Sequence, residues 1–393
     1  MPETGIKEYI EWRGDVTFET DPFGEVDALV LAELSYVPFE GVLENGGAGD
    51  GLPESLTLRE AAARFDKDSV DEKLRIYTFD RDAELLALAG ESARFGDIVV
   101  SGYTAKLSPE RDQQFAAEVF TLPDGTRFIA FRGTDDTIAG WKEDFNISYM
   151  TETPAQKLAA EYLEKQGENA GRVIVGGHSK GGNLAVYAAM KCSDEVRGRL
   201  VCVYSFDGPG LRSETVKTDE YKRTVPLITS IIPESSLVGQ LLTGSADHII
   251  VRSSGTGVLQ HMAFTWEVMR NRFVRAEELS GFGMFVNKTV TAWLTDLGDE
   301  DRRMFTKALF DIIEASDAET FGELSKSKLK ASKAALKAFS SLRPEQQAAM
   351  RHALKELARS GGHALKELTA EKIQPSVPIL MDKSDTSSTT RSK

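Results

Sequence analysis

The stretch VIVGGHSKGGNLAVYAAM, residues 173–190, places four glycines around one serine, Ser179. It begins as a β-branched apolar run and ends as an alanine-rich run, which predicts a strand followed by a helix. Between them Gly177, Ser179 and Gly181 fit the pattern G-x-S-x-G, a sharp turn that lifts a serine above the end of a sheet. The turn is either ordinary β–α chemistry or a strained backbone that holds Ser179 as a nucleophile.

Strand-like and helix-like segments alternate on both sides of this turn. Runs rich in β-branched and aromatic residues predict strands at 97–103, 115–122, 126–132, 172–175, 200–206, 227–232 and 248–252. Apolar or helix-forming runs predict helices at 26–37, 58–65, 80–88, 155–166 and 183–192. Strands that alternate with helices indicate an α/β fold, with a mainly parallel sheet covered by helices on both faces.

The chain has 393 residues, enough for one large domain and an appendage. The alternating pattern and the helices before it predict an α/β domain over residues 1–275. Residues 276–374 are rich in Ala, Leu, Lys and Glu and are expected to form a helical extension. Residues 375–393 are polar and rich in Ser and Thr, and a disordered tail is expected there.

The composition indicates which binding partners and which cellular compartment are expected. A formal net charge of −14 argues against nucleic acid or an anionic membrane surface as the main partner. The two cysteines, Cys192 and Cys202, cannot build a disulfide framework, and they favour a reducing, cytoplasmic location. No run of about 18 apolar residues occurs and the first residues lack an apolar signal region, so neither stable membrane insertion nor secretion is expected. The oligomeric state stays open.

A serine nucleophile needs a base, and the chain offers five histidines: His178, His248, His261, His352 and His363. His178 lies inside the turn and is expected to point away from the serine, while the last two are expected to be solvated on C-terminal helices. His248 opens a predicted strand. His261 follows that strand in a loop, which is where this class of fold carries its base, so His261 is the preferred base. The alternative role for His261 is packing beside Trp266.

Acyl transfer also needs two preorganised backbone N–H groups that hold an oxyanion. The residue after the nucleophile, Lys180, is expected to supply one of them. Thr134 is expected to supply the other, because the strand at 126–132 is followed by Gly133 and then by this small hydroxylic residue. An ordinary exit from strand to loop is the alternative.

Three segments together resemble the class 3 lipase-like α/β-hydrolases, and most closely a bacterial branch of unknown function. They are FRGTDDTIAGWKED (131–144), GGHSKGGNLA (176–185) and QHMAFTW (260–266). The resemblance covers roughly residues 26–275 and implies an α/β-hydrolase fold. It also implies that Ser179 is the nucleophile and that Thr134 is one of the oxyanion donors.

The resemblance breaks at the acid that orients the base. Class 3 lipases carry an Asp just before Val-Pro, and the matching position here holds Ser230. Asp207, directly after the predicted strand at 200–206, is the favoured substitute, and Glu234, one strand later, is the alternative. The plainer roles are a turn-forming residue before Gly-Pro for Asp207 and a solvated loop carboxylate for Glu234.

Together these residues predict a serine hydrolase that cleaves a small-molecule ester or lipid through an acyl-enzyme, without a metal or an organic cofactor. A set of carboxylates fits no calcium-binding loop and is expected to be solvated; it comprises Asp135, Asp136, Glu143 and Asp144. Two alternatives remain open. One is a thioesterase or amidase with the same triad, and the other is a non-catalytic hydrolase-fold protein that binds or scaffolds a partner.

Overall fold

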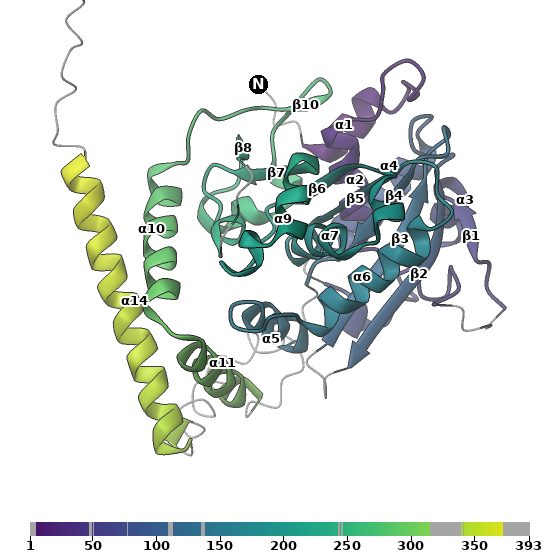
Figure 1. Cartoon of the computed structure of the whole chain (residues 1–393). Helices are drawn as coiled ribbons and strands as arrows, with labels where there is room; N and C mark the ends of the chain where they lie inside the picture. The colour runs from purple at the N-terminus through teal and green to yellow at the C-terminus, as the bar shows by residue number, and fades with distance from the viewer. Residues whose placement is uncertain are drawn as a thin grey trace, which may run out of the picture.

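The computed structural model describes residues 5–46, 49, 51–76, 78–108, 113–134, 138–242, 244, 247–314, 339–340 and 342–371. The expected disordered tail at 375–393 and the carboxylates Asp135 and Asp136 lie outside the described residues. Figure 1 shows a central sheet with helices packed against it and with the C-terminal helices gathered at one side.

Within the described part of the chain, eight strands form one sheet in chain order. They are β1 (Ser55–Thr57), β2 (Val99–Ser108), β3 (Gln113–Thr121), β4 (Arg127–Phe131), β5 (Val173–His178), β6 (Leu200–Phe206), β7 (Ile228–Pro233) and β8 (His248–Val251). The first four strands pair antiparallel, and the strands from β4 to β8 pair parallel. Parallel pairs need crossover connections, and helices supply them between β4 and β7.

Helices cover both faces of the sheet and bury a separate apolar cluster on each. Alternate residues of β4 belong to different clusters, with Phe128 in the first and Ile129 in the second. The first cluster includes α1 (Ile6–Arg13), α2 (Glu25–Leu34), α3 (Leu58–Arg64) and α4 (Phe79–Glu91). The second includes α6 (Pro154–Gly167), α7 (Lys180–Lys191), α8 (Asp194–Arg197) and α9 (Asp219–Thr224).

Among the described residues, three long helices follow the sheet: α10 (Gly281–Asp296), α11 (Asp299–Glu314) and α14 (Pro344–Glu371). Figure 1 shows α14 running beside α10. These helices bury a small apolar cluster of their own, around Phe305 and Met350, and Phe145 of α5 (Ile138–Asn146) packs against it. They have the helical character expected of residues 276–374, while the boundary itself stays a prediction. No helix of the described residues is long and apolar enough to cross a membrane.

The structure confirms the expected α/β-hydrolase architecture and corrects some of its boundaries. Helix α7 begins at Lys180 rather than at 183, because packing overrides the low helix propensity of the two glycines in its first turn. Strand β1 and the pair β9 (Val268–Met269) and β10 (Arg272–Phe273) were not expected. Each is too short to show the alternation that identifies a strand.

Candidate active site

Ser179 sits at the turn between β5 and α7, in a backbone conformation that non-glycine residues rarely adopt. Its φ is 57° and its ψ is −131°, and its amide N–H donates to the Phe206 carbonyl at 2.9 Å. Such a conformation costs on the order of 1–3 kcal/mol and persists only where the surroundings enforce it. The turn therefore has the strained geometry that the G-x-S-x-G pattern predicts.

The neighbouring glycines show what enforces this strain. A Cβ on Gly181 would lie 2.0 Å from the Phe131 carbonyl oxygen, and a Cβ on Gly177 would lie 2.5 Å from the same atom. The end of β4 thus presses against the first turn of α7, and only glycine leaves room for that approach. Helix α7 begins at Lys180, so its positive N-terminal end lies directly after Ser179.

His261 ends the 3₁₀ turn η6 (Gly257–His261) and faces Ser179. Its Nε2 lies 3.0 Å from the Ser179 Oγ, and its side chain is 27% exposed. Trp266 is fully buried behind this loop and donates its indole N–H to the Gln260 carbonyl at 2.8 Å. The imidazole is therefore held within hydrogen-bond reach of the hydroxyl and remains accessible to a ligand.

Asp207, at the end of β6, contacts the other nitrogen of the same imidazole. Its Oδ2 lies 2.6 Å from the His261 Nδ1, and the residue is fully buried. Its Oδ1 accepts the Gly239 N–H at 3.0 Å and also accepts the Ser236 hydroxyl. This carboxylate requires a proton on Nδ1, so in the neutral imidazole Nε2 is the acceptor that faces Ser179.

Glu234, the alternative acid, is not brought to this imidazole. It lies just after β7, and its backbone carbonyl accepts the Ser280 N–H at 2.7 Å. None of the hydrogen bonds among the described residues joins its side chain to His261. The structure thus brings together Ser179, His261 and Asp207 and leaves Glu234 outside the group.

His178 does not face Ser179 but packs against His261, a contact that the sequence pattern did not reveal. The two imidazole centroids are 4.7 Å apart, and the ring planes differ by 32°. The His178 Nε2 lies 2.8 Å from the His261 carbonyl oxygen, so this nitrogen carries a proton and donates. The Nδ1 then accepts, and the Tyr36 hydroxyl lies 3.2 Å from it. His178 therefore supports both the ring and the backbone of His261.

A buried carboxyl group lies at the far edge of His178. The Glu33 Oε1 is 3.2 Å from the His178 Nδ1. Burial, and next the neighbouring His261, lower the pKa of His178 to about 3. Burial, and next the charge of Asp82, raise the pKa of Glu33 well above its ordinary value. Both shifts favour the neutral forms, so this contact joins uncharged groups and is not an ion pair.

Lys180 and Thr134, the expected oxyanion donors, lie on the two chain segments that meet at the turn. Lys180 is the first residue of α7, where backbone N–H groups have no partner inside the helix. Thr134 follows β4, in which Phe131 pairs with Gly177 of β5. The Thr134 hydroxyl donates to Asp144. Both residues thus border the turn, and their role as donors to an oxyanion stays a prediction.

The Lys180 side chain forms a buried ion pair behind the turn. Its Nζ lies 3.2 Å from the Glu143 Oε2 and 2.9 Å from the Gln114 carbonyl oxygen. The Glu143 carboxylate also accepts the backbone N–H groups of Gln114 and Ala155, at 3.1 and 2.8 Å. The expectation of a solvated carboxylate is therefore wrong for Glu143, which is buried because these donors replace water.

The other expected features are found away from this site. His352 and His363 are exposed on α14, as expected of solvated residues. His248 opens β8, and its side chain hydrogen-bonds to Ser230. Within the described ranges, no group of three or more His, Cys, Asp or Glu side chains could hold a metal ion.

A protein family and a solved structure are similar to this chain. A family model described as Mbeg1-like matches residues 89–311, which is more than half of the sequence. The match begins within α4 and ends within α11, so it extends past residue 275 into the C-terminal helices. Among solved structures, the crystal structure of M37 lipase is similar over 54% of this chain and 68% of that chain, with 15% sequence identity and a TM-score of 0.33. No relative is found among the curated proteins.

Proposed function

The chain belongs to the Mbeg1-like family, a lipase-like family, and on that premise we propose that it is a serine hydrolase that cleaves carboxylic esters through an acyl-enzyme. One observation carries the proposal: a hydrogen-bonded line runs from the Ser179 Oγ through His261 to the buried Asp207. The strained backbone of Ser179, at the N-terminus of α7, supports the same role.

In the proposed reaction the Ser179 Oγ attacks the acyl carbon of the ester while the His261 Nε2 accepts its proton. Asp207 stabilises the resulting imidazolium through the Nδ1–H. The backbone N–H groups of Lys180 and Thr134 hold the oxyanion of the tetrahedral intermediate. The intermediate then collapses, the bond from carbon to the alcohol oxygen breaks, and the alcohol leaves with the proton from His261.

The second half of the reaction regenerates the serine. A water molecule gives a proton to the His261 Nε2 and attacks the acyl carbon, and the new oxyanion occupies the same two N–H groups. Collapse releases the carboxylic acid, and the proton returns to the Ser179 Oγ. Every proton transfer uses Nε2, which is why the side of the ring that carries Nδ1 has to stay fixed on Asp207.

His178 is proposed as a positioning residue in this scheme. Its Nε2–H holds the His261 carbonyl and its ring packs on the His261 ring, so it limits how far the base can turn away from Ser179. Because it is buried and its pKa is lowered to about 3, it stays neutral at the pH where esterases work and adds no positive charge beside the imidazolium.

A fluorophosphonate probe tests the proposal directly, because it forms a covalent bond only with an activated serine. We expect the full-length chain to gain one label, measured as an increase in intact mass. Ser179→Ala is expected to gain none, and the matched control Ser213→Ala, which changes an exposed serine, is expected to gain one. A Ser179→Ala chain that is still labelled would remove the nucleophile assignment.

Initial rates on matched substrates then separate the possible reactions. The series consists of aryl esters of increasing acyl length, an aryl thioester and an anilide with the same acyl group. We expect the esters to be the better substrates. Preference for the thioester or the anilide would keep the triad and change the substrate class. An unlabelled wild-type chain with no turnover would instead favour a hydrolase-fold protein that binds a partner.

A further inference from the structure

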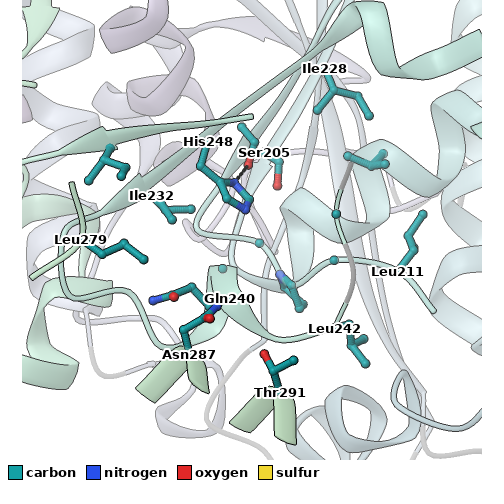
Figure 2. A pocket seen from close by; sticks show the side chains of 18 of the residues that line it. Ser205, Leu211, Ile228, Ile232, Gln240, Leu242, His248, Leu279, Asn287 and Thr291 are labelled. Carbon is teal, nitrogen blue, oxygen red and sulfur yellow. Dashed lines mark hydrogen bonds between the residues drawn. The ribbon is translucent and has the colours of Figure 1, made fainter. Parts of the chain in front are cut away.

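A cavity of about 350 Å³ lies over β6, β7 and β8, and neither Ser179 nor His261 lines it. Figure 2 shows Ser205, His248 and Ile232 around it, together with Gln240, Asn287 and Thr291. The last two residues belong to α10, so one wall of the cavity comes from the first of the C-terminal helices. The volume falls at the lower end of the range of roughly 300–1,000 Å³ that is usual for small-molecule sites.

A row of three polar side chains forms the side of the cavity that belongs to the sheet. Ser205 pairs with Ser230, and Ser230 pairs with His248, so the three project from one face of consecutive strands. The Ser230 Oγ lies 2.9 Å from the His248 Nδ1. Ser230 is buried whereas His248 is exposed and lines the cavity, so the imidazole can present its second nitrogen to a ligand.

The remaining lining divides into polar and apolar parts. The amides of Gln240 and Asn287 and the hydroxyl of Thr291 form a second polar group, which comes from η5 (Val238–Gln240) and α10. The rest of the lining is mainly aliphatic and includes Val186, Leu211, Ile228, Ile232, Ile250 and Leu279. Such a lining suits a molecule with an alkyl part and hydrogen-bonding groups.

The lining also carries little charge. None of the described residues that line the cavity is Lys, Arg, Asp or Glu. The titratable groups in the lining are Tyr221 and His248, and the packing around the His248 imidazole partly desolvates it and lowers its pKa, which favours the neutral form. A charged ligand would lose its hydration here without gaining an ion pair, and that cost is large. The cavity therefore discriminates against carboxylates and amines.

We propose that this cavity is a second binding site, separate from the triad, for a small uncharged amphipathic molecule such as an alkylglycerol. The hydroxyl groups of the ligand hydrogen-bond to the row formed by Ser205, Ser230 and His248, and the alkyl part lies against the aliphatic walls. The proposal gives α10 a role, since this helix supplies part of the site. It does not depend on the esterase reaction, because no residue of the triad lines the cavity.

Calorimetric titration of the full-length chain with 1-O-hexylglycerol tests this site. The probe is an ether, so the triad cannot hydrolyse it. We expect saturable binding with one site per chain and a Kd below about 1 mM. Hexanoate and hexylamine, which carry the same alkyl chain and a charge, are expected to bind at least about tenfold more weakly, since the cavity offers no opposite charge.

A pair of variants at one position locates the binding. Asn287→Trp fills the cavity from α10 and is expected to weaken binding of the ether by at least about tenfold, whereas Asn287→Ala leaves the space open and is expected to stay within about threefold. Thermal unfolding of both variants checks that they fold. Ser230→Ala removes one hydroxyl inside a strand and is expected to weaken binding by roughly five- to tenfold, the usual size of one hydrogen bond.

Three results would overturn the proposal. They are equal affinity in Asn287→Trp and Asn287→Ala, hexanoate binding as tightly as the ether, and the absence of saturable binding up to about 5 mM ether. Ser179→Ala is titrated alongside these variants. Loss of binding in that variant alone would show that the ether binds at the triad, and this result would also reject the second site.

Discussion

Two serine–histidine hydrogen bonds lie close to the sheet, one on the turn that follows β5 and the other between the neighbouring strands β7 and β8. The Ser179 Oγ is 3.0 Å from the His261 Nε2, and the Ser230 Oγ is 2.9 Å from the His248 Nδ1. The first serine sits on a strained turn at a helix N-terminus, and the second lies within β7. A short contact between a serine and a histidine therefore does not by itself identify a nucleophile.

The second nitrogen of each imidazole shows the chemical difference. The His261 Nδ1 is held by the buried carboxylate of Asp207, which fixes the tautomer and can stabilise an imidazolium. Among the described residues, no hydrogen bond joins His248 to a carboxylate. The His248 Nδ1 instead contacts the neutral hydroxyl of Ser230, whereas the His261 Nδ1 contacts a carboxylate, and the following predictions test that contrast.

The largest expected effect separates the two serines. Ser179→Ala should reduce the kcat for a short-chain aryl ester by on the order of 10⁵-fold, because it removes the nucleophile. Ser230→Ala should change kcat by less than about tenfold, since it removes one neutral hydrogen bond. Circular dichroism and thermal unfolding of both variants serve as the folding control. Comparable losses in the two variants would erase the distinction between the pairs.

The second prediction concerns the carboxylate behind His261. Asp207→Asn should lower kcat by up to about 10⁴-fold, because an amide can hold the imidazole in the wrong tautomer. Glu234→Gln is the matched control, and we expect little change because none of the described hydrogen bonds joins its side chain to His261. If the Glu234 variant is the impaired one, the acid lies on the later strand and the geometry around Asp207 has another purpose.

The third prediction sharpens the role of His178. His178→Phe keeps a ring beneath His261 but loses the N–H that holds its carbonyl, and kcat should fall by about 10²-fold, the cost of a base displaced by about 1 Å. KM should stay nearly constant, because His178 is buried and is not expected to touch the substrate. His178→Gln restores an N–H at similar reach and should recover part of kcat. Equal rates in the two variants would show that this hydrogen bond is not used.

Much of the fold could be read from the sequence because its signals are local. The run from β5 to α7 carries its β-branched residues, its glycines and its alanines in one short segment, and the hairpin of β3 and β4 is marked by Pro123-Asp124-Gly125. The pair β9 and β10 was missed because pairing with a neighbour, rather than its own pattern, makes it a strand.

A residue of the candidate site could be predicted from the sequence when the chain offers few residues of the required type, and could not when it offers many. Few histidines could serve as the base, so His261 could be chosen, but many carboxylates could serve as the acid. Only the fold shows that Gly239 and Ser236 anchor Asp207. The burial of Glu143 depends on Lys180, which is distant in the chain, and no local pattern reports such a pairing.

The smallest expected effect is on stability, and it also concerns His178. The pKa of His178 is lowered from 6.5 to about 3 in the folded protein, first by burial and then by His261. Between these values the unfolded chain binds a proton that the folded chain does not, so stability is fully present above about pH 6.5 and decreases as the pH falls. The wild-type protein should lose about 1.4 kcal/mol for each pH unit in this window through this residue.

His178→Phe lacks this titration, so the gap in the free energy of unfolding between the wild type and the variant should shrink between pH 6.5 and 5.5, measured by urea unfolding. Asp82 acts in the opposite direction: burial raises its pKa from 3.8 to about 8, so its contribution falls as the pH rises through that range. Asp82 and Glu33 are present in both proteins, and their effects largely cancel in the difference. His352→Phe, which removes an exposed histidine, is measured in parallel as the control variant. A constant gap for His178→Phe would mean that folding does not lower the pKa of His178, so the buried imidazole would take up a proton as readily as in the unfolded chain, and its Nδ1 would then donate to Glu33 rather than accept from Tyr36.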